Sequence, residues 1–162
     1  MNKIFNVQTT LLRKSNLEDH NMDLCLFKQT PVTFEINVKH SNNEIEGKKG
    51  FFNVNVDLTL KSFVAEKDEN DTTVKGLPIY SANIRYSGIF LIEGFSPEEL
   101  VVILAVNCPS LVFPYARAEM NRLLSETQMQ KPHLQPIQFD TMYHQKVQKD
   151  LAAKEAGFNT ED

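Results

Sequence analysis

The side chains that could carry catalysis or hold a metal are few and lie far apart in the sequence. The 162-residue chain has four histidines and two cysteines, Cys25 and Cys108, and no CxxC pair or zinc-ligand spacing joins them. The phosphate-binding glycine motifs and the GxSxG and HExxH motifs of hydrolases are also absent. The sequence therefore predicts a protein that is not an enzyme and that has neither a metal site nor a cofactor.

The charged residues that could form a catalytic pair have structural explanations. Glu98 and Glu99 follow Ser96 and Pro97, which is the sequence of a capped helix start in which Ser96 and Glu99 form a capping box. Carboxylates in a first helical turn are also stabilised by the helix dipole. We expect Arg117 to bind main-chain carbonyls at a helix end, and an anion site is the alternative.

Three strands follow from a regular alternation of apolar and polar residues. Residues 32–39, 52–61 and 80–87 each place apolar side chains at every second position, as a half-buried strand requires. Weaker signals, chiefly β-branched residues, predict short strands within 4–12 and 24–27. The clear strands are joined by polar connections that suit hairpins.

Two apolar helical segments flank an unusual block at 108–117. Residues 97–106 begin at the predicted cap and are then apolar on all sides, so this helix must be packed between two surfaces. Pro109 and Pro114 each lack an N–H and disfavour helix in the residue before them. We therefore expect a break over 108–112 and a new helix that starts at Pro114.

A last helix is predicted from Asp140, with Tyr143 and Leu151 on a thin apolar stripe. Residues 152–162 are predicted to form a frayed tail. Because strands come first and helices follow, the chain has the order of an α+β domain. We expect a four-stranded antiparallel sheet with the helices packed on one face, in a single domain over 1–162.

The composition limits the partners and the location of the protein. The net charge is −4, which argues against a nucleic-acid binder because such proteins carry a basic face. No wholly apolar run approaches the roughly 20 residues of a membrane span, which predicts no membrane insertion. The N-terminus lacks the apolar block of a signal peptide, so we expect a cytoplasmic protein.

The sequence offers more apolar surface than one face of a sheet needs. At Gly88 the alternation stops and residues 89–92 are apolar on both faces, which predicts a bulge or bend at the glycine and cover on both sides. The two apolar helical segments add to this surplus. A thick ordinary core would account for it, and so would burial between subunits or an apolar groove.

Three blocks of sequence resemble the SecB protein-export chaperone family. They are GIF at 88–90, NCPSLVFPYAR at 107–117 and LQPIQFD at 134–140. The middle block is specific to that family, and the order and spacing of the blocks also fit. The resemblance covers roughly residues 79–147, and upstream it depends mainly on the strand pattern.

This resemblance implies a cytosolic, ATP-independent holdase that binds unfolded preproteins in apolar grooves and passes them to the SecA motor. It also implies a homotetramer, assembled as a dimer of dimers. The residues that the resemblance assigns to client binding are Phe27, Phe90, Phe113, Phe139 and Tyr143. Those that it assigns to the subunit interface are Tyr80, Ala82, Ile84 and Tyr86.

Two positions depart from the family pattern. The acidic residue with which the family docks the motor is replaced by Asn83, and a second acidic docking patch is represented by Asp23. The chain also lacks the tryptophan that the family often carries. The sequence therefore leaves two kinds of partner open, SecA or an antitoxin, because some SecB-like chaperones are dedicated to toxin–antitoxin systems.

A ligand-binding or thioesterase domain of the hot-dog type is the alternative from a different class. Such a domain also wraps an apolar helix in an antiparallel sheet, but its chemistry needs a carboxylate on or beside that helix. Residues 100–106 offer no polar side chain. The client of a chaperone is not identified by the sequence.

Overall fold

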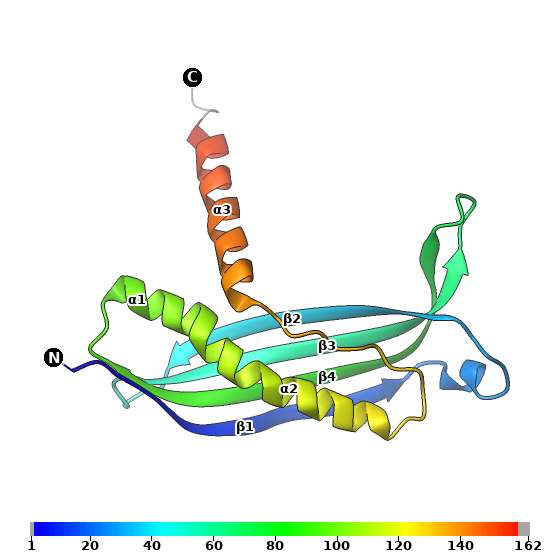
Figure 1. Ribbon diagram of the computed structural model, residues 1–162, viewed down its shortest axis with the longest axis horizontal. Coiled ribbons are helices and arrows are strands. Elements are labelled where there is room, and N and C mark those ends of the chain that lie inside the picture. Colours follow the sequence, from blue (N-terminus) through cyan, green and yellow to red (C-terminus); the bar gives the residue numbers. More distant parts are fainter. Residues whose placement is uncertain (1, 159–162) are drawn as a thin grey trace.

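The structure, a computed structural model, describes residues 2–158. Four antiparallel strands form one sheet in the order β1-β4-β3-β2, with a long helix crossing one face (Figure 1). The predicted α+β class is confirmed. The strands are β1 (Ile4–Asp19), β2 (Val32–Glu44), β3 (Phe51–Lys67) and β4 (Thr73–Glu93).

The alternation that predicted the strands also separates the two faces of the sheet. On β3, the side chains of Val54, Val56, Leu58 and Leu60 are at most 1% exposed and point toward the helical layer. The residues between them are polar and point the other way. We call the side covered by the helix the helix face, and the opposite side the open face.

Gly88 lies in a regular part of β4, so the predicted bulge at this residue is wrong. Its neighbours pair without interruption with both β1 and β3. A Cβ at Gly88 would lie 2.5 Å from Phe90 Cε2 and 2.8 Å from Val112 Cγ2. The glycine is therefore needed for close packing on the helix face. The register of β1 shifts instead at Gln8 and at Arg13, and that between β3 and β4 shifts near Phe63.

The N-terminal region has one strand where two short ones were predicted. β1 extends to Asp19, and the predicted strand at 24–27 is wrong, because a short 3-10 helix, η1 (Met22–Cys25), begins there. The Asp19 carboxylate accepts a hydrogen bond from the Met22 N–H at 2.9 Å, which turns the chain at the end of β1.

The first helix begins as predicted and then continues through the predicted break. α1 (Pro97–Val102) has the expected capping box at Ser96. A π-helical turn, η2 (Ile103–Asn107), then leads into α2 (Cys108–Ser125) without interruption. The wider turn lies directly before Pro109 and makes room for its ring, so the proline does not end the helix.

The joined helix, Pro97–Ser125, is long and apolar enough to cross a membrane by length and composition, with a mean hydropathy of 1.6 over its most apolar window. A third of that window is buried in the single chain. Core helices of soluble proteins pass the same test, so this is weak evidence for a membrane span. About half of the residues of this helix are exposed in the single chain.

The last helix, α3 (Phe139–Phe158), points away from the sheet (Figure 1). It starts one residue before the predicted cap Asp140. It also continues to Phe158, although the sequence predicts a frayed tail from 152 onward. Residues 152–156 contain three alanines, a lysine and a glutamate, which are strong helix formers. The rest of the predicted tail, 159–162, lies outside the described residues.

Candidate functional site

The largest hollow lies where two connections meet beside the end of the sheet, and we call it the loop cleft. Its volume is about 740 Å³. Residues 25–32 between β1 and β2 form one wall, and residues 128–130 after α2 form another. Ser62, Ile79 and Tyr80 complete the lining from β3 and β4. The cleft is therefore built by loops on a rigid sheet.

The wall of the loop cleft presents unburied apolar side chains. Phe27 is 94% exposed and Leu26 is 57% exposed. An exposed phenylalanine of this kind gains free energy only when another surface covers it, at about 25 cal/mol for each Å² of apolar area. The loop cleft is therefore suited to bind an apolar side chain of another molecule.

Polar groups at the base of the loop cleft are held in fixed positions. The Tyr80 hydroxyl donates a hydrogen bond to the main-chain oxygen of Gln130 at 3.1 Å, which ties the wall at 128–130 to β4. Burial, with a smaller effect from nearby Cys25, raises the pKa of Tyr80 to about 12, so its hydroxyl stays protonated. The buried Ser62 hydroxyl has no hydrogen-bond partner among the residues that the structure describes. Because the Ser62 side chain is only 1% exposed, this hydroxyl belongs to the base of the cleft and not to its accessible surface.

Only one of the five residues assigned to client binding lines this cleft, and it is Phe27. Phe90, Phe113 and Phe139 are at most 5% exposed, so in the single chain they are core residues and not a client surface. The rings of Phe113 and Phe139 meet edge to face with centroids 6.0 Å apart. Tyr143 is half-buried near the start of α3. Sequence reasoning missed the cleft residues at 128–130, since only nearby prolines marked a loop there.

The residues predicted for the subunit interface lie mostly inside the single chain. Tyr80, Ala82 and Ile84 are at most 2% exposed, because these positions of β4 lie on the helix face under α2. Tyr86 is half-buried and stacks on Tyr115 with ring centroids 5.6 Å apart. Exposed apolar side chains lie instead on the edge strand β1 and on the outer side of the long helix, at Ile4, Phe5, Val7, Leu12, Val101, Val102, Leu111 and Tyr115.

The two positions predicted for motor docking are both accessible. Asn83 is half-exposed on the open face, paired with Asn16 on one side and Thr59 on the other. Asp23 is exposed in η1, outside the sheet. No contact between Asn83 and Asp23 joins them into one patch.

The structure also shows the surroundings of Arg117 and Cys108. Arg117 makes no hydrogen bond or ion pair with any residue between 2 and 158, so the expected bonds to main-chain carbonyls are absent. Burial raises the pKa of the Cys108 thiol to about 12, which makes it an inert core residue. The described residues contain no group of three or more metal-ligating side chains.

Comparison with known proteins places the chain among export chaperones. A family model described as SecB, preprotein translocase subunit, matches residues 1–150. The protein-export protein SecB of Acidithiobacillus ferrooxidans (strain ATCC 53993) is 24% identical over 142 residues, which cover 88% of this chain and 89% of the relative. That of Neisseria meningitidis serogroup B is 26% identical over 149 residues, which cover 92% and 94%.

A solved structure shares the fold at low sequence identity. It is a SecB-like chaperone of Mycobacterium tuberculosis in complex with a ChAD peptide from the HigA1 antitoxin. The TM-score is 0.61 with 12% identity, and the match covers 82% of this chain and 90% of the other.

Proposed function

The chain belongs to the SecB family, and from this premise we propose that it is an ATP-independent holdase for unfolded proteins on the way to export. Its curated relatives are named protein-export proteins. We also propose that it works in the cytoplasm, where such clients are made. The loop cleft is the observation that supports this function most directly, because it offers an exposed apolar wall without catalytic chemistry.

The mechanism that we infer is passive binding. An apolar side chain of the unfolded client packs on Leu26 and Phe27. Apolar side chains recur throughout unfolded chains, so the cleft can bind many sequences. Because the holdase binds the unfolded state, it delays folding by mass action and needs no nucleotide.

We propose that further copies of the chain cover the exposed apolar side chains of the long helix and of β1. The helix Pro97–Ser125 is only one-third buried over its most apolar window. Val101, Leu111 and Tyr115 on its outer side are 45–54% exposed. An isologous contact buries one such surface against its copy, and a second contact through β1 would complete a homotetramer as a dimer of dimers. Light scattering should give four times the chain mass of 18.5 kDa, and a stable monomer would contradict the assembly.

A chaperone dedicated to a toxin–antitoxin system is the second candidate. The solved SecB-like chaperone is in complex with a peptide from an antitoxin. The neutral Asn83 supports this candidate, because a basic docking segment of SecA gains nothing from an amide. A thioesterase function has no support from the helix, since the Glu119 carboxylate on α2 is bonded to Ser15 and Arg122.

The experiment is a refolding assay with a chemically unfolded client and no nucleotide. The wild-type protein should slow refolding, and Leu26→Ser with Phe27→Ser should weaken client affinity about tenfold or more, from the apolar area lost. Leu151→Ser is the control, since Leu151 is 55% exposed on α3 away from the cleft. If an excess of the wild-type protein leaves the rate of client refolding unchanged, the holdase function is contradicted. If the cleft and control variants weaken client affinity equally, the client binds outside the loop cleft.

A further inference from the structure

The strand β1 places two consecutive cationic side chains on the same face of the sheet. In a regular strand, consecutive side chains point to opposite faces. The register between β1 and β4 shifts at Arg13, which is an extra residue without a partner of its own on β4. The Arg13 guanidinium donates hydrogen bonds to Ser87 Oγ at 3.3 Å and to Asn53 Oδ1 at 3.4 Å on the open face. Lys14 lies opposite Arg85, also on the open face.

Such a bulge is a device that re-aims a side chain. Here it directs Arg13 and Lys14 at one hollow of about 580 Å³ on the open face. We call the charged residues that line this hollow the bulge cluster. Its members are Arg13, Lys14, Asp57 and Arg85.

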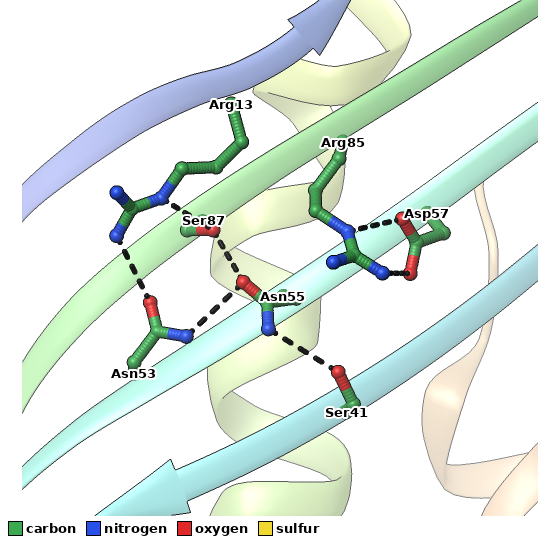
Figure 2. Close-up of polar contacts among 7 residues, drawn as sticks. All are labelled: Arg13, Ser41, Asn53, Asn55, Asp57, Arg85 and Ser87. Carbon is green, nitrogen blue, oxygen red and sulfur yellow. Dashed lines mark hydrogen bonds and ion pairs between the residues drawn. The ribbon is translucent and has the colours of Figure 1, made fainter. Parts of the chain in front are cut away.

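The bulge cluster has an excess of positive charge in an acidic protein. Asp57 and Arg85 form a bidentate pair with N–O distances of 2.6 and 2.9 Å, so these two charges balance each other (Figure 2). Arg13 and Lys14 have no carboxylate partner among residues 2–158. The cluster therefore carries two unbalanced positive charges, whereas the whole chain has a net charge of −4.

A row of amide and hydroxyl groups holds the floor of the hollow in place. Asn55 Oδ1 accepts hydrogen bonds from the Ser87 hydroxyl at 2.5 Å and from Asn53 Nδ2 at 3.1 Å. Asn55 Nδ2 donates to Ser41 Oγ at 3.2 Å (Figure 2). Because Ser87 is fully buried and also bonds Arg13, the network fixes the direction of the guanidinium. Because the guanidinium of Arg13 is already held in place, a ligand that binds it costs the protein little further side-chain entropy.

These observations identify the chemistry of the occupant. A guanidinium and an ammonium beside fixed side-chain amides are suited to carboxylates, which accept charge-assisted hydrogen bonds from both. A nucleic acid fits less well, because the cluster includes the Asp57 carboxylate and a phosphate backbone needs a longer track of cations. We propose that the open face docks an acidic peptide segment of a partner protein, with its carboxylates on Arg13 and Lys14.

This docking surface is distinct from the loop cleft. The two hollows share no lining residue. The bulge cluster lies on the side of the sheet opposite α2, whereas the cleft lies among the loops beside the end of the sheet. The protein can therefore hold an unfolded client and an acidic partner at the same time.

The test is a titration of the full chain with a short fluorescein-labelled peptide of alternating aspartate and serine, followed by fluorescence anisotropy. This peptide has no apolar side chain for the loop cleft. We expect saturable binding that weakens with salt, and no binding of matched peptides with lysine or asparagine in place of aspartate. Absence of binding by the acidic peptide, or equal binding of all three, would overturn the proposal. Tighter binding of single-stranded DNA than of the acidic peptide would also overturn it.

Variants locate the site. Arg13→Gln with Lys14→Gln should weaken the peptide about tenfold, from the loss of two exposed charge contacts. Lys149→Gln with Lys154→Gln removes the same charge from exposed positions of α3 and should leave affinity unchanged. Since Arg13 belongs to the network, Lys14→Glu is the second variant. Lys14 makes no described hydrogen bond, so this change should abolish binding in a folded protein. Equal affinity of Lys14→Glu and the wild type would refute the site.

Discussion

The helix face and the open face of the sheet are made by alternate residues of the same strands, and they differ in almost every physical respect. Toward α2, β3 presents Val56 and Leu58, which are at most 1% exposed. Between them, on the open face, Asn55 and Asp57 are half-exposed and hydrogen-bonded to neighbouring strands. Because side chains alternate along a strand, the helix face supplies stability. Polar groups on the open face can then be arranged with little effect on the core.

This difference explains why the apolar residues of β4 that were predicted to be functional are buried in the single chain. An apolar residue in a clean alternating pattern marks the face that the protein buries in its own core. The apolar surface left for other molecules lies where that pattern is missing, in the loop at Phe27, along the edge strand at Val7 and on the outside of the helix at Leu111. The specific polar contacts lie on the open face.

The largest effect is expected from breaking the helix face. Leu58→Ala removes a side chain that is 1% exposed and should lower the free energy of unfolding by about 2–4 kcal/mol, from lost burial and the cavity left behind. Thr59→Ala, the next residue on the open face, should change it by less than about 0.5 kcal/mol. Urea denaturation at fixed protein concentration measures both. Equal effects would mean that the two faces do not differ as described.

A smaller effect is expected from breaking the network of the open face. Asn55→Ala removes the acceptor for the buried Ser87 hydroxyl and should cost about 1 kcal/mol. Asn83→Ala is the matched control on the same face, because Asn83 makes no side-chain hydrogen bond within residues 2–158. Urea denaturation again provides the comparison. A control as damaging as Asn55→Ala would show that the network contributes no particular stability.

The smallest expected effect is a change of stability with pH, caused by His40 where β2 meets the start of α3. Burial lowers the pKa of His40, and nearby Lys146 lowers it further. The ring meets Phe139 edge to face at 5.8 Å, and its buried Nδ1 has no described partner. Because the fold favours the neutral ring, its contribution to stability is complete above the unfolded pKa of about 6.5 and is lost as the pH falls through the folded pKa.

The variant His40→Leu keeps the apolar contact with Phe139 and removes the titration. Thermal melts between neutral and mildly acidic pH should therefore show a smaller loss of Tm for this variant than for the wild type. His133→Gln is the control, since His133 is exposed and should leave the pH dependence as it is. A wild type and a His40→Leu variant with the same pH dependence would contradict the role of His40.

The parts of the fold that the sequence predicted correctly are those governed by simple periods. The alternation within 52–61 identified β3 and its two faces, and Ser96 with Glu99 identified the start of the long helix. β1 was predicted only in part, because the extra residues Gln8 and Arg13 interrupt its period twice. A bulge is invisible to a pattern that counts every second residue.

The parts of the fold and of the site that were not predicted depend on three-dimensional geometry that the residue types do not determine. Proline rules predicted a break before Pro114, yet the helix continues through a π turn that no residue type in 103–107 announces. The loop cleft combines residues from four parts of the chain, so its Ser62 hydroxyl could not be identified before the sheet was known. The resemblance named the family correctly, but it could not indicate that Phe90 and Ile84 are at most 2% exposed in the single chain.

The bulge at Arg13 has a consequence for how such a protein can change over generations. Leu12 pairs with Tyr86 and Lys14 pairs with Arg85, which are consecutive on β4, so the ladder would close if Arg13 were deleted. In terms of the gene, Arg13 is a single-codon insertion that the sheet accommodates without moving any other side chain to the wrong face. A lineage can gain or lose this cation in one step while the core stays as it is, so partner choice and folding can evolve separately.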